Sequence, residues 1–124
     1  MTDQYDPERA PDSAEWLELD EQERIILIEE YHSRKRIRLP NLAAHAVFHA
    51  IVENQIAEGL EPVLRAMARL ANEGMSRHDA VHAIGFVVAE HVNDLFKSQD
   101  DATTSQARYN AAIERLNAKS WRGG

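Results

Sequence analysis

The sequence predicts an all-α protein, an antiparallel helical bundle of four to five helices. Three observations support this fold class. Apolar residues recur at helical spacing in several long segments, helix caps and helix-ending residues separate those segments, and no segment alternates between apolar and polar residues as a half-buried strand does. Because the connections between the segments are short, we expect neighbouring helices to run antiparallel.

The first long helix is expected over residues 21–36. Asp20 and Glu23 have the spacing of a capping box, and the apolar residues behind them recur with the period of a helix. Before this helix, Ser13 can cap a short helical turn that brings Trp16 against the bundle. Residues 1–12 are polar and acidic, so we expect them to form a flexible N-terminal arm.

The second and third helices have clear boundaries. Asn41 is placed to cap the second helix, and Gly59 to end it. Pro62 stands where a helix tolerates proline, in the first turn of the third helix, which runs to Gly74.

A fourth and a fifth helix follow. The spacing of Ser76 and Asp79 is that of a second capping pair, and the helix behind it is expected to continue to about residue 97. After a polar loop, Thr104 or Ser105 is expected to start a weakly amphipathic fifth helix through Leu116. The bundle domain is thus expected over residues 13–118, with residues 119–124 as a tail.

The composition limits the classes of function. A chain of 124 residues forms one domain, and its net charge of -7 disfavours a nucleic-acid partner. The absence of cysteine excludes disulfides, thiolate metal sites and cysteine nucleophiles. No stretch approaches the roughly 18 to 20 apolar residues of a membrane span, and the first residues do not resemble a targeting peptide. We therefore expect a cytoplasmic protein without a membrane partner.

The second helix carries an unusual polar row. His45, His49 and Glu53 recur every four residues, so in a helix they lie on one face. That face also holds apolar residues, whereas Asn54 and Glu58 form the polar face opposite. The row is therefore expected to point into the protein. A buried carboxylate is normally paired or bound to a metal, so Glu53 needs a partner.

The fourth helix offers a matching pair, His78 and His82, at the edge of its apolar face. If the second and fourth helices are neighbours, this pair and the polar row converge. The predicted metal ligands are His45, His49, Glu53, His78 and His82. This donor set suits a divalent transition metal such as zinc, iron, nickel or manganese.

The other polar residues receive lesser roles in this hypothesis. Glu53 is expected to be the charged ligand or the base that acts on a metal-bound water, and Gln55, Asp79 and Glu90 are expected to orient the ligands from behind. His32 and His91 are expected at the surface. No catalytic residue and no substrate are assigned.

A second hypothesis has no metal and no catalysis. The same histidines and Glu53 would form a buried hydrogen-bond network that fixes the register of the helices in an interaction module, with a homodimer interface as one setting.

Enzyme signatures are weaker alternatives. HDAVH differs from the metalloprotease motif HExxH by Asp79, whose shorter side chain reaches a zinc-bound water poorly, and the His78-Asp79 pair lacks the further ligands of the HD phosphohydrolases.

The two histidine segments resemble a family of small bacterial proteins with a domain of unknown function. Its members carry N-x-x-x-H-x-x-x-H-x-x-x-E-x-Q and, further along, H-E-A-x-H-A. The segments here are LPNLAAHAVFHAIVENQIAEG and EGMSRHDAVHAIGFVVAEHVNDLF. The matching residues are Asn41, His45, His49, Glu53, Gln55, His78, His82 and Ala83. Asp79 replaces the usual Glu of the family. The resemblance covers roughly residues 40–96 and implies a helical fold, but it implies no activity.

Overall fold

The computed structural model describes residues 4–35, 41–97 and 101–121. Within these ranges the chain forms helices and no strand, which confirms the all-α fold class. The helices are α1 (Ser13–Glu18), α2 (Glu21–Arg34), α3 (Leu42–Ala57), α4 (Glu61–Asn72), α5 (Arg77–Lys97), α6 (Ala102–Arg115) and α7 (Ala118–Trp121). None of the described helices combines the length and the apolar character that crossing a membrane requires.

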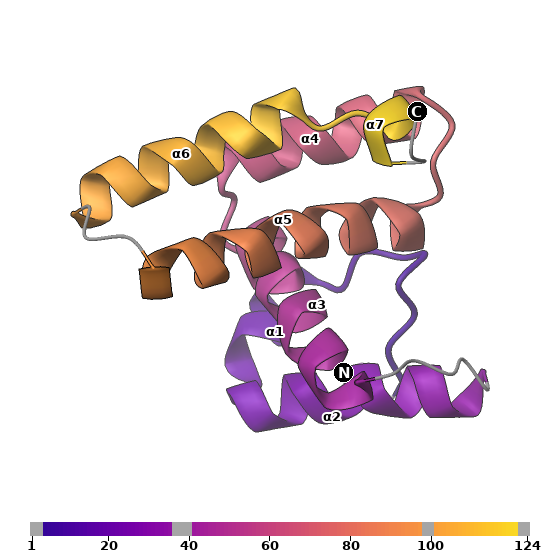
Figure 1. Ribbon diagram of the computed structural model, residues 1–124. Coiled ribbons are helices and arrows are strands. Elements are labelled where there is room, and N and C mark those ends of the chain that lie inside the picture. The colour runs from indigo at the N-terminus through magenta and orange to yellow at the C-terminus, as the bar shows by residue number, and fades with distance from the viewer. Residues whose placement is uncertain (1–3, 36–40, 98–100, 122–124) are drawn as a thin grey trace.

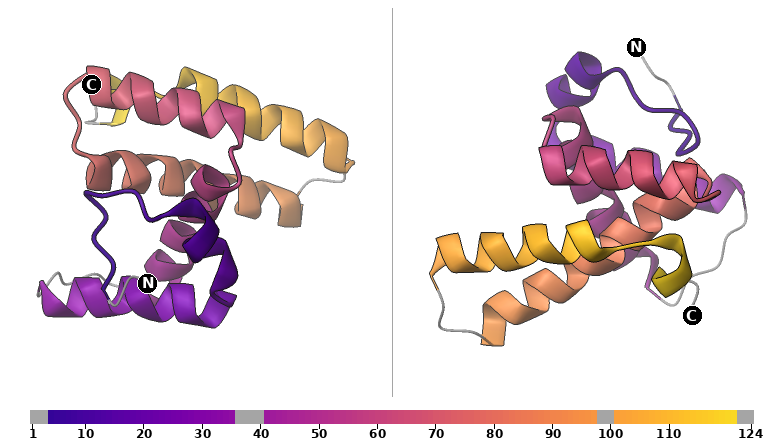
Figure 2. Two further views of the ribbon diagram at one scale, coloured as in Figure 1. Left: turned by 180° about the vertical axis from the view of Figure 1, so that it is seen from behind. Right: turned by 90° about the horizontal axis from the view of Figure 1, so that it is seen from above.

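Helix α5 lies at the centre of the arrangement. Helices α4 and α6 lie along one side of α5 and run antiparallel to it, as the short connections predict (Figure 1). Helices α3 and α2 lie on the other side, and the view from behind shows the same order (Figure 2). Helix α3 crosses α5 and α2 instead of running alongside them, so the antiparallel arrangement is limited to α4, α5 and α6.

The predicted helix ends are observed at most boundaries, although Asp12 and not Ser13 caps α1, with the Glu15 amide donating to Asp12 Oδ1 at 3.0 Å. Asp20 and Glu23 form the capping box, with the Glu23 amide donating to Asp20 Oδ1 at 2.9 Å and the Asp20 amide donating to Glu23 Oε1 at 3.2 Å. The Ala44 amide donates to Asn41 Oδ1 at 3.1 Å. Gly59 and Gly74 have φ values of 76° and 90°, in the left-handed region that favours glycine.

The last helices differ from the prediction. Helix α6 begins at Ala102, because Asp101 and not Thr104 or Ser105 is the cap: its Oδ1 accepts the Thr104 amide at 2.7 Å. A carboxylate satisfies that amide and also interacts favourably with the helix dipole. Residues 119–121, expected in the tail, belong to α7, and the Ala118 amide at its start donates to Glu73 Oε1 at 2.6 Å. Residues 122–124 lie outside the described residues.

The core has two parts. The larger part is apolar and is formed by residues of α3, α4, α5 and α6. Its fully buried residues include Val63, Leu70, Ile84 and Ile113. The smaller part lies among α1, α2 and α3. There Asn54, expected on the polar face of its helix, accepts hydrogen bonds from Trp16 Nε1 at 2.9 Å and Arg24 Nη1 at 3.0 Å. These bonds attach α1 and the start of α2 to α3.

The N-terminal segment is packed against the helices, which corrects the expectation of a flexible arm for residues 4–12. Tyr5 is 1% exposed, and Pro7 is also buried. The segment is tied by its backbone as well, because Arg34 donates to the Tyr5 carbonyl at 3.2 Å and Arg77 to the Pro7 carbonyl at 2.8 Å. Residues 1–3 lie outside the described residues.

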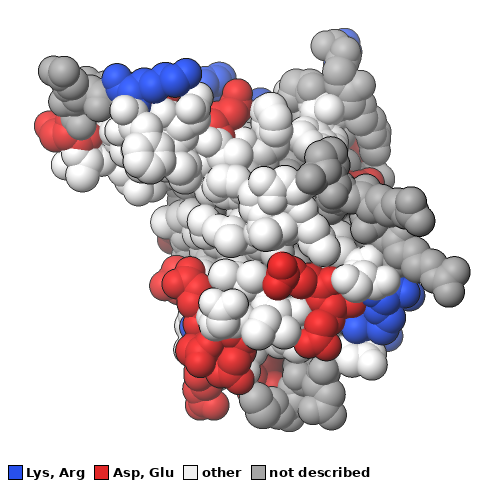
Figure 3. Space-filling model, turned by 60° about the horizontal axis from the view of Figure 1, so that its bottom comes forward, with Lys and Arg blue, Asp and Glu red and all other residues white. Residues whose placement is uncertain are grey.

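The surface around α2 is charged. Acidic side chains gather at several places on this face, and basic ones appear near the carboxyl end of the helix (Figure 3). Helix α2 ends at Arg34, followed by Lys35, and the expected extension to residue 36 falls outside the described part of the chain. A face with this mixed, mainly acidic character agrees with the net charge of -7.

Candidate metal centre

Five histidines gather where α2, α3 and α5 meet. They are His32 of α2, His45 and His49 of α3, and His78 and His82 of α5. The centroids of neighbouring rings lie 4.1 to 5.8 Å apart. The predicted convergence of the two histidine pairs is therefore present, and it depends on the direct packing of α3 on α5.

His32 was expected at the surface, and this prediction is wrong. Its side chain is 0% exposed and its ring faces the other four imidazoles. The Nδ1 of His32 donates to the Ile28 carbonyl at 2.9 Å, which leaves the lone pair on Nε2. His32 follows Ile25 by seven positions and Ile28 by four, so it shares the inward face of α2.

Four of the imidazoles are close enough to share one metal ion. His32, His49, His78 and His82 can each offer one ring nitrogen, and these nitrogens all lie within 4.8 Å of one another. Around a tetrahedral ion with bonds of about 2.0 to 2.1 Å, ligand nitrogens would lie roughly 3.4 Å apart. The rings therefore need only a small inward movement to bind an ion.

Three ring nitrogens in this cluster are buried and have no hydrogen-bond partner among the described residues: His32 Nε2, His49 Nδ1 and His78 Nε2. Leaving a buried polar atom without a partner costs about 1 to 3 kcal/mol, and most such atoms in native proteins are satisfied. A metal ion would satisfy all three at once, since each presents a lone pair when the imidazole is neutral.

His45 stands beside this set of four. Its Nε2 lies 2.9 Å from Nε2 of His82, so one ring donates and the other accepts. In this arrangement His45 orients His82, although it was predicted as a ligand itself.

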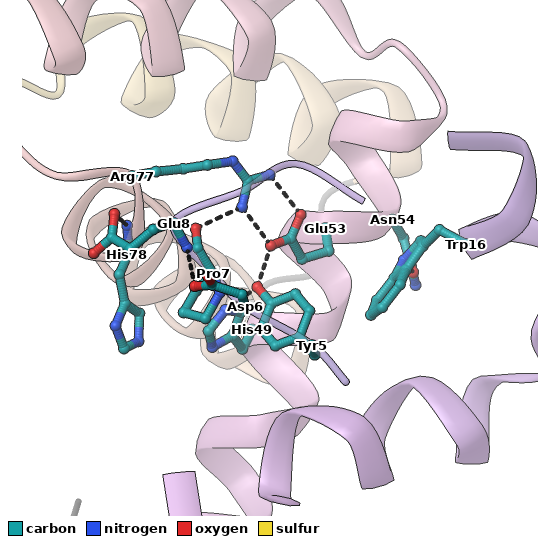
Figure 4. A network of polar contacts seen from close by, with 10 residues as sticks. All are labelled: Tyr5, Asp6, Pro7, Glu8, Trp16, His49, Glu53, Asn54, Arg77 and His78. Carbon is teal, nitrogen blue, oxygen red and sulfur yellow. Dashed lines mark hydrogen bonds and ion pairs between the residues drawn. The ribbon is translucent and has the colours of Figure 1, made fainter. Parts of the chain in front are cut away.

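Glu53 has an ionic partner that the sequence did not indicate. Its buried carboxylate accepts hydrogen bonds from Arg77 Nη1 and Nη2, both at 2.8 Å, and from the Tyr5 hydroxyl (Figure 4). The predicted inward orientation of Glu53 is confirmed by its 1% exposure. Its contacts, however, are with Arg77 and Tyr5, and in this conformation the carboxylate is not directed at the four imidazoles.

The Tyr5 hydroxyl connects Glu53 to His49. It donates to Glu53 Oε2, so its oxygen accepts from His49 Nε2, which lies 2.7 Å away. Because Nε2 then carries the proton, the lone pair of His49 is on Nδ1, the buried nitrogen without a partner. Carboxylates that fix the tautomer of a metal-binding histidine in this way are common behind metal ligands.

The electrostatics of the cluster favour neutral imidazoles. Burial, with a contribution from neighbouring imidazoles, lowers the pKa of His45 to about 4 and the pKa of His82 to about 3. Burial also lowers the pKa of His49 and of His78. Only the neutral ring binds a metal. The lowered pKa values therefore keep His45, His49, His78 and His82 in the form that can bind one at neutral pH.

Beside Glu53, both Tyr5 and Arg77 remain protonated. Burial, followed by the charge of Glu53, raises the pKa of Tyr5 well above 10.0, so its hydroxyl remains a donor. Burial opposes the charge of Arg77, but the hydrogen bond to Glu53 and its charge outweigh burial and raise the pKa of Arg77.

The residues predicted to orient the ligands have other contacts. Gln55 Oε1 accepts from the Tyr109 hydroxyl at 2.7 Å. Asp79 is exposed, and its amide donates to Ser76 Oγ at 3.1 Å in the predicted cap of α5. Glu90 is exposed. His91, expected at the surface, is partly buried against the ring of Tyr109, with centroids 4.8 Å apart.

Comparison with models of protein families, with curated proteins and with solved structures found no match. The resemblance to a bacterial family therefore remains a prediction, and the function must be inferred from the geometry of the histidine cluster.

Proposed function

We propose that the protein binds one divalent transition metal ion through His32, His49, His78 and His82. The observation that carries the proposal is that these four residues offer ring nitrogens within 4.8 Å of one another. In three of the four, a buried ring nitrogen has no hydrogen-bond partner among the described residues. Helices α2, α3 and α5 would then be joined by the ion as well as by their packing.

The proposal assigns Glu53 and His45 to supporting positions. Glu53, held by Arg77, orients His49 through Tyr5, and His45 orients His82. Four imidazoles can complete a tetrahedral zinc site, whereas iron, nickel or manganese would take further ligands. This set of neutral nitrogen donors does not select one of these metals by itself.

Metal content of purified protein tests the proposal. After loading with zinc, iron(II), nickel or manganese and removal of the excess, one of these metals should remain at about one equivalent per chain and should raise the melting temperature, because the ion binds only the folded state. His49→Gln and His32→Gln should lose the metal. His91→Gln, which removes the one histidine outside the cluster, is the matched control and should retain it.

The same measurements separate the two proposed ligand sets. Retention of metal in His32→Gln together with its loss in His45→Gln or Glu53→Gln would support the set predicted from sequence instead. If the wild-type protein holds none of these metals, and its melting temperature is the same with metal and with chelator, the metal proposal is wrong.

The second candidate is a module held by a polar network without metal. The hydrogen bonds of Glu53 with Arg77 and Tyr5, and the bond between His45 and His82, favour it because they are complete without an ion. Homodimerisation would belong to this candidate. Leu95 and Phe96, which are 48% and 86% exposed near the end of α5, offer an apolar contact for it. Sedimentation of Phe96→Ser against wild type tests this contact.

A further inference from the structure

An apolar cleft opens beside the histidine cluster, between α3, α5 and α7. We call it the α5 cleft. Its volume is about 250 Å³. Its lining residues are His45, Phe48, His49, Val81, His82, Gly85, Phe86, Ala89 and Trp121. Three of the five clustered imidazoles therefore face a space that is otherwise bounded by hydrocarbon and aromatic rings.

The α5 cleft is shaped by small residues on α5. Gly85 has no side chain to fill it, and the nearest atoms to a Cβ at this position, in Val52 and Phe48, lie 3.8 to 4.0 Å away. Ala89 follows one turn later on the same face of the helix. Phe86 and Trp121 form the outer wall, with ring centroids 5.9 Å apart. Larger residues at 85 and 89 would close the space that leads to His49 and His82.

The lining also restricts what can occupy the cleft. Among the described residues that line the cleft there is no Asp, Glu, Lys or Arg, and an imidazole that binds a metal is neutral. The charged pair nearest the cluster, Glu53 with Arg77, does not line the cleft and is satisfied internally. A second cleft at the N-terminal segment contrasts with it, since Asp6, Glu8, Arg9 and Arg34 are among its lining residues. An ion entering the α5 cleft would lose its hydration without a charged partner in the described part of the wall.

From these features we propose that the α5 cleft admits a small uncharged molecule, with an apolar body and one metal-binding atom, to the metal held by the histidine cluster. This inference rests on the proposed metal site, and it adds that the metal has a coordination position open toward the cleft. A volume of about 250 Å³ equals that of about eight water molecules in the liquid, so the ligand has on the order of ten non-hydrogen atoms at most.

The first experiment asks whether the coordination position is open. The protein is loaded with iron(II) under anaerobic conditions, its metal content is measured, and nitric oxide is added as the probe. An electron paramagnetic resonance signal of an iron-nitrosyl complex should appear at about one per bound iron. Bound iron that gives no such signal would mean a closed centre and would overturn the inference, while leaving the proposed metal site intact. A protein that binds no metal would overturn both.

The second experiment asks whether the ligand lies in the cleft. Alkyl isocyanides are uncharged and bind iron(II) through one atom, so their affinity can be measured from methyl to propyl by the change in absorbance. Burial of each added methylene should strengthen binding about fourfold. An affinity that does not depend on chain length would place the alkyl group in solvent and would contradict the inference.

Variants of the cleft complete the test. Ala89→Phe should weaken binding of propyl isocyanide at least about tenfold, the factor given by ~1.4 kcal/mol, with no loss of iron. Ala71→Phe makes the same change at an exposed alanine on α4, outside the cleft, and should leave binding unchanged. Equal binding in Ala89→Phe and wild type would show that the ligand uses another route.

A second variant covers the case in which Ala89→Phe does not fold. Phe86 is 56% exposed, so Phe86→Ala removes the outer wall with little effect on the core. The association rate of nitric oxide should rise several-fold in this variant. A rate equal to that of the wild type would mean that Phe86 does not border the route, and would count against the inference.

Discussion

Helix α5 makes two contacts that are built in different ways. Toward α4 and α6 it contributes Ile84 and Val88 to an apolar core. Toward α2 and α3 it contributes Arg77, His78 and His82 to a polar one. The apolar contact is complete by itself, because burial of hydrocarbon needs no specific partner. The polar contact provides hydrogen bonds for Glu53, but within the described part of the chain it leaves one ring nitrogen each of His32, His49 and His78 without a hydrogen-bond partner.

This difference explains why the two contacts should respond to different changes. The apolar contact should be sensitive to lost volume and indifferent to metal and pH. The polar contact should be sensitive to the loss of a single charge or proton, and to metal. Four predictions separate the two contacts, beginning with the one that has the largest expected effect.

Arg77→Met should break the polar contact. It leaves the carboxylate of Glu53 buried without its cationic partner, and removing one member of a buried ion pair lowers the free energy of unfolding by about 3 to 5 kcal/mol. Urea denaturation measures this loss. The matched control is Arg65→Met, which removes an exposed pair with Glu114 and should leave stability nearly unchanged. Similar stabilities for the two variants would contradict the buried ion pair.

Ile113→Ala should weaken the apolar contact without affecting the polar one. Ile113 is 0% exposed in the core beside α5, and such truncations cost about 2 to 5 kcal/mol. Metal content should stay at the level of the wild type at a temperature where the variant is folded. A parallel loss of stability and metal would show that the two contacts do not behave independently.

Tyr5→Phe should affect the polar contact mildly in stability and more clearly in metal affinity. It removes the hydrogen bonds to Glu53 and His49, and a hydrogen bond to a charged group contributes about 1.5 to 3 kcal/mol. Since the tautomer of His49 is no longer fixed, metal affinity should fall about 10- to 100-fold. Competition with a chromophoric chelator measures the affinity. An unchanged affinity would exclude Tyr5 as the residue that orients His49.

Acidification should destabilise the metal-free protein through the polar contact. The pKa of His82 is lowered to about 3 and that of His45 to about 4 by burial, from an ordinary value of 6.5. Between pH 6.5 and pH 3 these two histidines bind more protons in the unfolded chain than in the folded one. Their contribution to the free energy of unfolding is therefore fully present above pH 6.5 and is lost as the pH falls toward 3. We expect this effect to be the smallest of the four predicted effects, because His45 is only partly buried and solvent screens its charge.

Urea denaturation at several pH values between 7 and 4 measures this dependence. His82→Gln should show a shallower decline, because one titrating group with a lowered pKa is gone. His91→Gln, outside the cluster, should decline as the wild type does. A stability that rises on acidification would contradict the direction of these shifts.

Much of the fold could be predicted because its signals are local. The capping box of Asp20 and Glu23, the cap at Asn41 and the glycines at 59 and 74 act over a few residues, and each appears where expected. The start of α6 was placed too late because several oxygen-bearing side chains lie within residues 101–105, and sequence spacing does not rank Asp101 above Thr104 or Ser105 as the cap.

The candidate site could be predicted only in part. The rows of α3 and α5 were found because their period of four puts histidines on one face. His32 was missed because it lies in a polar stretch at the end of α2, although its spacing from Ile25 and Ile28 places it on the apolar face. Tyr5 and Arg77 could not be found in this way, since they meet Glu53 from distant segments that no local period connects.

The position of Pro7 against Arg77 has a consequence for how the molecule assembles. These residues are 70 positions apart, and Tyr5 reaches Glu53 across 48, whereas α4, α5 and α6 follow one another directly. Closing a long loop costs more chain entropy than joining successive helices. In refolding we expect the three consecutive helices to gain hydrogen-exchange protection first, and the N-terminal segment to dock last.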